Sequence, residues 1–310
     1  MIRATLLGPL GPAPDLALEL RALQLDGPVA LITAGWEEGE RNDADIDRRL
    51  GGGTRNLGLY GRRLDVLDSD GDYATAERAL HARLAEMREV YLLRLGHALA
   101  GAEAIRRRYA GSRRRAGTEL DEALSAVRAL DEGHAAAVDA ARTDFYRAHP
   151  PHERPAIQAH RDAVAAIVAE CAALAVAGGH VGVLNECLHL ANIGAMLGDR
   201  PLLAWSSGCM AVAERIVVID DTDPALRPDE VLDAGIGVVR GMVPIPDART
   251  RLRSRDPERL SLLARRGAPR VCVLLDEGDR VTWDEEHLAD LRAARVIGPD
   301  GTIRGGVVAA

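Results

Sequence analysis

The stretch PLLAWSSGCMAVA, residues 201–213, decides how we interpret the fold. It starts as an apolar run typical of a buried strand, passes through a turn of small residues, and continues in an apolar helical pattern. Ser206 lies in that turn, between Ala204 and Gly208. Small residues two positions either side of a nucleophile allow the sharp strand-to-helix turn that exposes a reactive hydroxyl in hydrolases. An ordinary turn with an idle serine has the same pattern, so both interpretations stay open.

A second loop lies upstream, in CAALAVAGGH, residues 171–180. This apolar run ends in Gly178, Gly179 and His180, and the helical pattern VGVLNECLHLANI follows. In many hydrolases a backbone N–H from a neighbouring strand-end loop supplies half of the oxyanion hole. We therefore expect the two loops to meet at one site.

Composition limits the class of protein. The 310 residues are 47% hydrophobic but only 3% aromatic, so the core is expected to consist of Ala, Val and Leu. The net charge of −8 argues against a nucleic-acid partner. No apolar run is long enough to span a membrane, and the first residues do not resemble a signal peptide. We expect a cytoplasmic protein with no membrane partner.

Cysteine and lysine usage excludes several chemistries. Cys171, Cys187, Cys209 and Cys272 lie in apolar runs without paired spacing, which favours reduced core thiols over disulfides or zinc ligands. The chain contains no lysine. A Walker phosphate loop, a pyridoxal Schiff base and a Ser-Lys dyad each need a lysine amine. Neither a cofactor nor a metal is expected.

Short apolar runs followed by turn residues recur along the chain. Runs of this kind, separated by helical patterns, predict a mostly parallel sheet with helices on both faces, a three-layer α/β/α sandwich. The expected strands are residues 2–8, 28–35, 63–68, 172–176, 201–205, 215–219, 235–239 and 270–276. Ligands of such sheets bind beyond the carboxyl ends of the strands. Trp36 and the acidic stretch after it follow one strand end, so they either line the cleft or form a solvated loop.

Residues 72–170 depart from this alternation. Apolar residues recur there at helical spacing, and glycines at 111–117 and prolines at 150–155 divide the segment into about three helices. We expect one α/β domain over residues 1–310, with a helical hairpin inserted at 72–170. The apolar positions are Leu80, Leu84, Met87, Tyr91, Leu95, Leu120, Leu124, Val127, Val138, Ala141 and Phe145.

Several stretches in this order resemble the cyanophycinase and aspartyl dipeptidase family of serine peptidases, whose fold is that of class I glutamine amidotransferases. The stretches are ALITAGWEEGE, AGGHVGVL, AWSSGCMAVAER, DAGIGVVRGMVPIPDAR and LLDEG. The chain also resembles bacterial proteins described as type 1 glutamine amidotransferase-like. The resemblance implies a serine peptidase or amide hydrolase with Ser206 as nucleophile and the N–H groups of Gly179 and Ser207 as oxyanion donors.

The resemblance fails at the general base. The family's histidine falls on Asp247, and a carboxylate with an ordinary pKa of about 4 is poorly matched to activating a serine at neutral pH. The supporting acid falls on Asp221 in the dipeptidase pattern or on Glu277 in the cyanophycinase pattern. His180 faces the elbow in this scheme, either as a base or as a helix-capping or substrate-contacting side chain.

Two other residues are weaker candidates. His287 lies in a charged stretch typical of a surface helix, and Cys209 lies about one turn into the helix after Ser206 and is expected to point into the core. Two functions therefore stay open. One is a serine hydrolase acting on a small peptide or amide-containing substrate, weakened by the missing histidine. The other is an inactive relative that binds a ligand or protein, and a homo-oligomer is compatible with either.

Overall fold

The computed structural model describes residues 3–11, 16–22, 27–109, 113–219, 221, 229–252, 255–284 and 294–305, apart from the side chains of 113–116. Its main sheet has six strands in the order β10-β1-β5-β4-β2-β3, all parallel except β10. Their bounds are β1 (Arg3–Leu7), β2 (Val29–Ile32), β3 (Arg55–Asn56), β4 (Ala173–Val176), β5 (Leu202–Trp205) and β10 (Arg280–Asp284). β2, β4 and β5 are buried at every position, as expected of strands covered on both faces.

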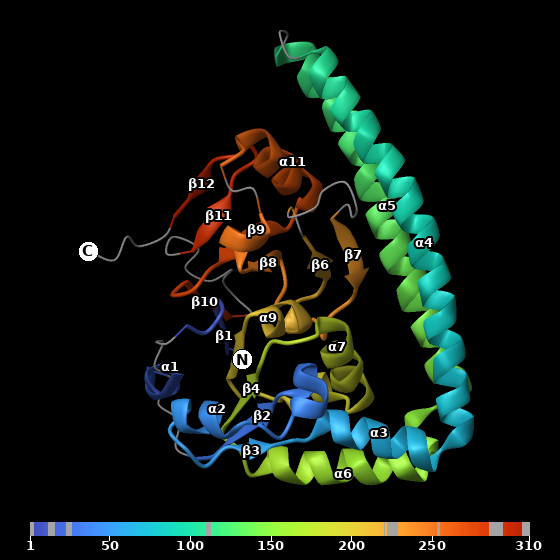
Figure 1. Ribbon diagram of the computed structural model, residues 1–310, viewed down its shortest axis with the longest axis vertical. Helices are drawn as coiled ribbons and strands as arrows, with labels where there is room; N and C mark the ends of the chain where they lie inside the picture. The colour runs from blue at the N-terminus through green and yellow to red at the C-terminus, as the bar shows by residue number, and fades with distance from the viewer. Residues whose placement is uncertain are drawn as a thin grey trace.

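Alternate residues of these strands face two separate hydrophobic layers. On one face, residues such as Leu31 and Leu203 pack with α1 (Leu16–Ala22) and α2 (Ala44–Arg49). On the other, Leu174 packs with helices of the opposite layer. These helices are α6 (Pro155–Ala169), α7 (Val181–Leu190), α8 (Ile193–Met196) and α9 (Ser207–Val212). Figure 1 shows the sheet between its helices, and the predicted three-layer α/β/α fold is confirmed.

A second, four-stranded sheet lies beside the first, in the order β12-β11-β9-β8. It contains β8 (Met242–Pro246), β9 (Val271–Leu275), β11 (Arg295–Ile297) and β12 (Ile303–Arg304). The helices α10 (Ala248–Arg251) and α11 (Pro257–Gly267) lie between β8 and β9 along the chain. A separate antiparallel pair consists of β6 (Ile216–Val218) and β7 (Glu230–Asp233). The expected strands at 215–219 and 270–276 therefore exist but lie outside the main sheet.

Two expected strands are wrong. Residues 63–68 belong to the helix α3 (Leu59–Ser69), whose buried residues Leu59 and Val66 are seven positions apart, as on one helix face. The carboxylate of Glu40 accepts hydrogen bonds from the N–H groups of Tyr60 and Gly61 at the start of this helix. Residues 235–239 form no strand and contribute one isolated bridge, Ala213 to Val239.

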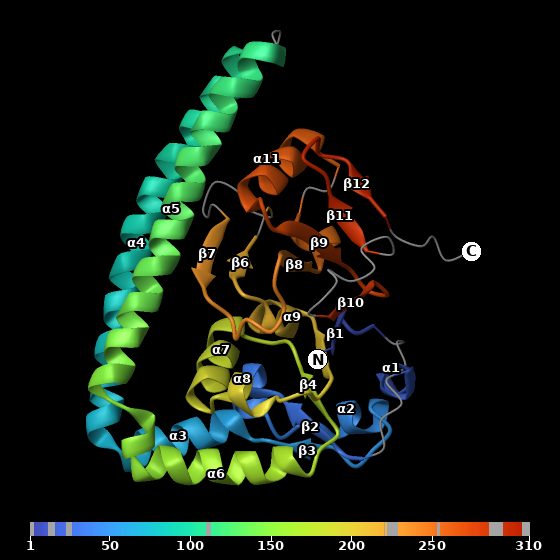
Figure 2. The ribbon, with the colours of Figure 1, turned by 180° about the vertical axis from the view of Figure 1, so that it is seen from behind.

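The expected helical hairpin is present and consists of α4 (Gly71–Arg108) and α5 (Arg113–Ala148). Two short 3-10 helices occur elsewhere, η1 (Ala34–Gly39) and η2 (Pro151–Glu153). Leu84 and Met87 are partly buried in the hairpin, and the other apolar positions named above are buried. Figures 1 and 2 show the hairpin along one side of the molecule, from α3 and α6 past α11.

Ion pairs attach the hairpin to the rest of the protein. Arg88 of α4 binds the carboxylate of Glu230 through two nitrogens, and Arg142 of α5 pairs with Asp233 of the same strand, β7. Higher up, Asp131 of α5 accepts two hydrogen bonds from Arg266 of α11, both at 2.7 Å. The two helices are thus held at fixed positions against β7 and α11.

Candidate functional site

Ser206 occupies a strained turn between β5 and α9. Its backbone angles are φ 53° and ψ −135°, a region that residues with a Cβ rarely adopt. The Ser206 N–H donates to the carbonyl oxygen of Leu7 at the end of β1, 3.2 Å away. Its side chain is partly exposed, and its hydroxyl makes no hydrogen bond with any described residue. The turn presents a free hydroxyl at the carboxyl edge of the sheet.

The glycine loop after β4 packs directly on this turn. A Cβ placed on Gly178 would lie 2.7 Å from the Cβ and 2.9 Å from the Oγ of Ser206, so only glycine fits there. On its other side the loop touches the end of β2, where the His180 N–H donates to the Gly35 carbonyl at 2.7 Å. Since β5, β4 and β2 are neighbours, three adjacent strand ends converge here.

The expected oxyanion donors differ in availability. The Gly179 N–H donates to the Oγ of Ser207 at 2.8 Å, and that hydroxyl in turn donates to the Gly179 carbonyl at 2.7 Å. The Ser207 N–H is the first of α9 and makes no hydrogen bond with the described residues. One of the two donors is therefore free, and the other is occupied by the side chain of Ser207.

His180 lies at the start of α7 and is exposed. Its Nδ1 accepts a hydrogen bond from the Val183 N–H at 3.2 Å, so the ring caps the helix. This contact corresponds to the capping alternative considered from the sequence. With Nδ1 accepting this bond, the neutral ring carries its proton on Nε2, so in this geometry neither nitrogen is set to take the proton of Ser206.

Asp247 follows β8 directly, in a left-handed conformation with φ 56°. Its Oδ1 accepts a hydrogen bond from the hydroxyl of Thr250, and its N–H donates to the Leu275 carbonyl. No hydrogen bond joins Asp247 to Ser206 among the described residues. The ends of β1 and β9 lie next to each other, because Gly8, which follows Leu7, packs against the Asp276 carbonyl. The surroundings of Ser206 and Asp247 are therefore linked through these two strand ends.

The buried acid after β9 is Asp276, the residue before the Glu277 expected from the sequence. Asp276 is 2% exposed and accepts a hydrogen bond from the Arg249 N–H at 2.7 Å, in the first turn of α10. It also pairs with Arg295 at 2.5 Å. Glu277 is exposed and lies against the backbone of Gly11. Asp276 is thus the buried acid beside the Asp247 backbone, and its position directly after the buried end of β9 is the signal that would have identified it.

Asp221 belongs to a different cluster. Its carboxylate is 7% exposed and binds the guanidinium of Arg259, which also binds Asp229. The Asp221 N–H donates to the Arg251 carbonyl. These contacts tie residues around α10 and α11 together, and a stabilising role in the second sheet is sufficient to explain them.

Cys209 points into the core. It is fully buried, and its thiol donates to the carbonyl oxygens of Leu7 and Ala204. Burial raises the pKa of this thiol to about 12, so it stays protonated and unreactive at neutral pH. His287 lies outside the described residues.

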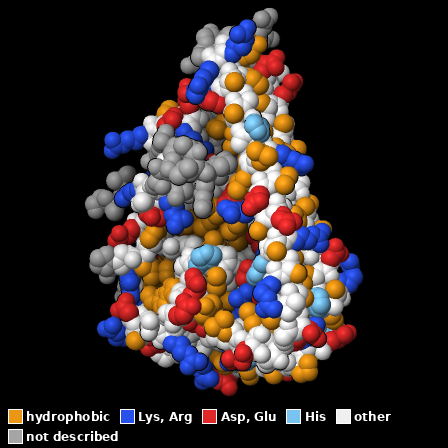
Figure 3. All heavy atoms as spheres, turned by 45° about the vertical axis from the view of Figure 1, so that its right-hand side comes forward, with side chains coloured by type: hydrophobic (Ala, Val, Ile, Leu, Met, Phe, Trp, Pro, Cys, Tyr) orange, Lys and Arg blue, Asp and Glu red, His pale blue; other side chains and the backbone are white. Residues whose placement is uncertain are grey.

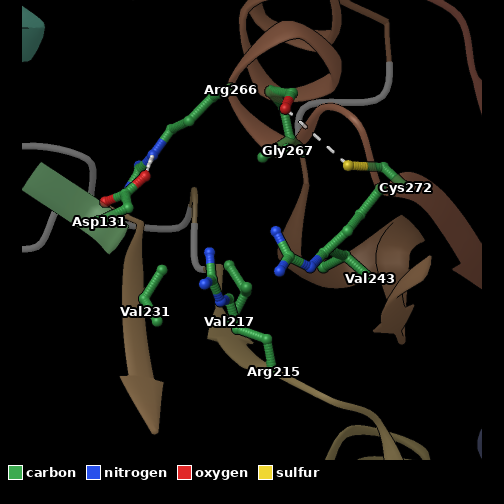
Figure 4. Close-up of a pocket in the computed structure, with 10 residues that line it drawn as sticks. Asp131, Arg215, Val217, Val231, Val243, Arg266, Gly267 and Cys272 are labelled. Carbon is green, nitrogen blue, oxygen red and sulfur yellow. Dashed lines mark hydrogen bonds and ion pairs between the residues drawn. The ribbon is translucent and has the colours of Figure 1, made fainter. Parts of the chain in front are cut away.

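Some features found elsewhere do not form a catalytic site. A cavity under α11, lined by Arg215, Arg266 and Cys272, has a volume of about 30 Å³ (Figure 4) and is too small for more than a water or two. Within the described ranges, no three His, Cys, Asp or Glu side chains are placed to hold a metal ion. None of the described helices combines the length and apolar character needed to cross a bilayer.

Comparisons with known proteins give the following. The chain matches no protein-family model and no curated protein. Among solved structures, a peptidase from an acI-B1 Actinobacterium superposes with a TM-score of 0.43 and 12% identity, over 96% of this chain and 87% of that one. A likeness of this degree does not identify an activity, so the functional argument depends on the site itself.

Proposed function

We propose that this protein is a serine hydrolase of low intrinsic activity that cleaves amide or peptide bonds, with Ser206 as nucleophile. The backbone strain at Ser206 supports this proposal most strongly. A residue in such a conformation costs about 1–3 kcal/mol and persists only where the surrounding structure holds it. Here the strain serves to present a hydroxyl beside the free Ser207 N–H and at the amino end of α9.

In this proposal the Ser207 N–H stabilises the developing oxyanion. The Gly179 N–H joins it only after the Ser207 hydroxyl rotates away, since that hydroxyl now occupies it. One preorganised donor contributes roughly 10²–10³-fold to such a reaction. The site as it stands therefore uses about half of the stabilisation that a complete oxyanion hole provides.

The activation of Ser206 is the weaker half of the site. Asp247 stands where the resembling family has its histidine, and the Asp276 carboxylate lies beside its backbone. A carboxylate base at neutral pH gives little of the roughly 10²–10⁴-fold that a matched general base contributes. We therefore expect low activity, because Ser206 is well presented but lacks a matched general base.

A second function has a specific observation in its favour. The Ser206 hydroxyl has no partner among the described residues, and the Gly179 N–H is occupied. Both features suit a relative that has lost catalysis and uses the cleft to bind a ligand. In that case the strained turn serves binding alone.

Labelling with a fluorophosphonate probe separates the two functions, because the probe reacts with activated serines whatever the substrate. The hydrolase predicts slow, time-dependent labelling that maps to the peptide containing Ser206 and disappears in Ser206→Ala. Cys209→Ser is the matched control, since the buried thiol takes no part. Absence of any labelling after prolonged exposure of the folded protein would favour the binding function.

A further inference from the structure

The outer face of the helical hairpin, formed around Val90 of α4 and Gly133 of α5, is exposed. Val90 and Leu93 are 50% and 65% exposed, although both side chains are large and aliphatic. At about 100° per residue, Val90 lies about 160° round α4 from Arg88. On α5, Gly133 lies about 180° round the helix from Arg142. Because both arginines bind β7, the outer face points away from that strand.

The part of the outer face on α5 consists of small residues. A hollow of about 610 Å³ runs between the two helices, lined by Val90 and Arg94 from α4 and by Gly133 from α5. A Cβ placed on Gly133 would meet nothing within 4 Å. Figure 3 shows hydrophobic side chains exposed along the hairpin among acidic and basic ones. Between residues 126 and 140, the exposed positions within about 60° of Gly133 are all alanine or glycine, namely Ala126, Ala129, Gly133, Ala136, Ala137 and Ala140.

The residues of α4 on the outer face complement a second copy of the same helix. Val90 lies at the middle of α4, which has 38 residues. Glu86 and Arg94 lie four positions before and after Val90, and all three are exposed. When a second α4 packs antiparallel on the first with Val90 at the two-fold axis, Glu86 of each copy lies level with Arg94 of the other. Met87 and Leu93, three positions before and after Val90, come level in the same way.

This symmetry continues toward both ends of α4. Asp72 and Arg108 are exposed and lie eighteen positions before and after Val90, so opposite charges come level there as well. Arg83 and His97, seven positions from Val90, share a level at which the guanidinium can stack on the imidazole ring. Within the described part of the chain, none of the four charged residues in the two opposite-charge pairs forms an ion pair. An antiparallel second copy would supply a partner for each of them.

We propose that two copies of this chain associate through their outer faces as a two-fold symmetric four-helix bundle. The α4 helices pack antiparallel about Val90, and α5 of each copy lies beside them with its small residues in the contact. A parallel arrangement in the same register would place Glu86 beside Glu86 and Arg94 beside Arg94, so the charges select the antiparallel one. The proposal does not depend on the activity of Ser206.

The outer face is large enough for a stable dimer. α4 is about 57 Å long, and two adjacent helices are about 20 Å wide. A face of these dimensions exceeds the roughly 800 Å² per partner that stable interfaces bury. Alanine and glycine on α5 allow the helix axes to approach to about 8 Å. The bundle therefore removes the side chains of Val90 and Leu93 from water, which favours association.

Analytical ultracentrifugation of the full chain at micromolar concentrations should give the mass of two chains. Oxidation of Val90→Cys should then join the two chains by a disulfide, because residue 90 lies on the two-fold axis. The native cysteines are buried and do not interfere. Ala104→Cys is the matched control, exposed on the same helix. Two copies of residue 104 lie about 42 Å apart in the antiparallel dimer, so this variant should not cross-link.

Charge reversal tests the register of the two helices. Glu86→Arg and Arg94→Glu should each weaken association at least tenfold, because each places like charges level with one another. The variant that carries both changes should recover the wild-type dissociation constant to within about threefold, since its charges are complementary again. Leu93→Glu should also weaken association at least tenfold. Leu64→Glu, at a 44% exposed leucine of α3, should leave it unchanged.

A wild-type protein that stays monomeric at every concentration overturns the proposal without the use of any variant. A dimer that keeps its affinity in Glu86→Arg and Leu93→Glu, or that cross-links equally through residue 104, overturns it as well. Cosedimentation of a monomeric protein with vesicles of phosphatidylcholine and phosphatidylglycerol, lost in Leu93→Glu, would assign the outer face to a lipid surface instead.

Discussion

Replacement of Gly178 by alanine tests the contact between the glycine loop and the elbow. The new Cβ would lie 2.7 Å from the Cβ of Ser206, whereas unstrained carbon contacts are about 3.5–4.0 Å, so one side must move by about 1 Å. The elbow is held by the bond from the Ser206 N–H to Leu7, and the loop by the two bonds between Gly179 and Ser207. Overpacking of this kind costs about 1–3 kcal/mol.

Two measurements follow from that estimate. Thermal unfolding should shift down by about 2–4 °C for each kcal/mol lost. A nucleophile displaced by about 1 Å loses roughly 10²-fold in rate, so fluorophosphonate labelling of Ser206 should fall by that factor. Gly101→Ala is the control, because a Cβ there meets nothing within 4 Å and alanine favours the helix by about 1 kcal/mol. A Gly178→Ala protein that melts and labels like the wild type would refute the packing described.

Three further predictions concern neighbouring groups. Ser207→Ala frees the Gly179 N–H, so the labelling rate of Ser206 should rise by roughly 10²-fold; a fall would show that the Ser207 hydroxyl assists the reaction. Asp247→His supplies a base matched to neutral pH and should raise labelling tenfold or more, and an unchanged rate in the folded variant would place residue 247 out of reach. The hydrogen bond to Glu186 raises the pKa of His81, so this pair stabilises the fold fully below pH about 6.5 and loses its effect as the pH rises through the folded pKa. His81→Gln should therefore destabilise the protein more at pH 6 than at pH 9 in paired chemical denaturations, and an equal loss at both would contradict this.

The sequence predicts local features well where a few neighbouring residues determine them. The small residues around Ser206 allow only a narrow turn after a strand, and the structure shows that turn. The buried thiol of Cys209 follows from its place one turn into the same helix. The hairpin follows from apolar spacing alone, since no strand pattern competes with it.

The secondary-structure predictions are wrong where contacts with residues far away in the sequence determine the structure. Residues 63–68 read as a strand, yet Glu40 caps the start of α3 from about twenty positions away along the chain. β8 is not among the strands expected from the sequence, and it contains Pro244 and Pro246, residues that are rare inside strands. Among the described residues it pairs with β9 alone, so it is an edge strand, where proline is tolerated.

The site shows the same limit. Which of Asp276 and Glu277 is buried depends on how the end of β9 meets β1, and that contact joins residues far apart in sequence. The occupation of the Gly179 N–H by Ser207 likewise depends on how two loops meet. Sequence patterns identified both loops and could not show that a side chain of one closes a donor of the other.

The backbone strain at this edge of the sheet is not confined to Ser206. Glu37, after β2, has nearly the same angles, φ 55° and ψ −123°, and its loop contacts the glycine loop through Gly35. Strained residues thus follow both β5 and β2, and the β4 loop between them contacts Ser206 on one side and Gly35 on the other. Glycine at either position would relieve the strain, so the requirements of the fold alone do not account for a serine and a glutamate there. Both turns place their side chains at the carboxyl edge of the sheet, where ligands of such sheets bind, as the proposed function requires.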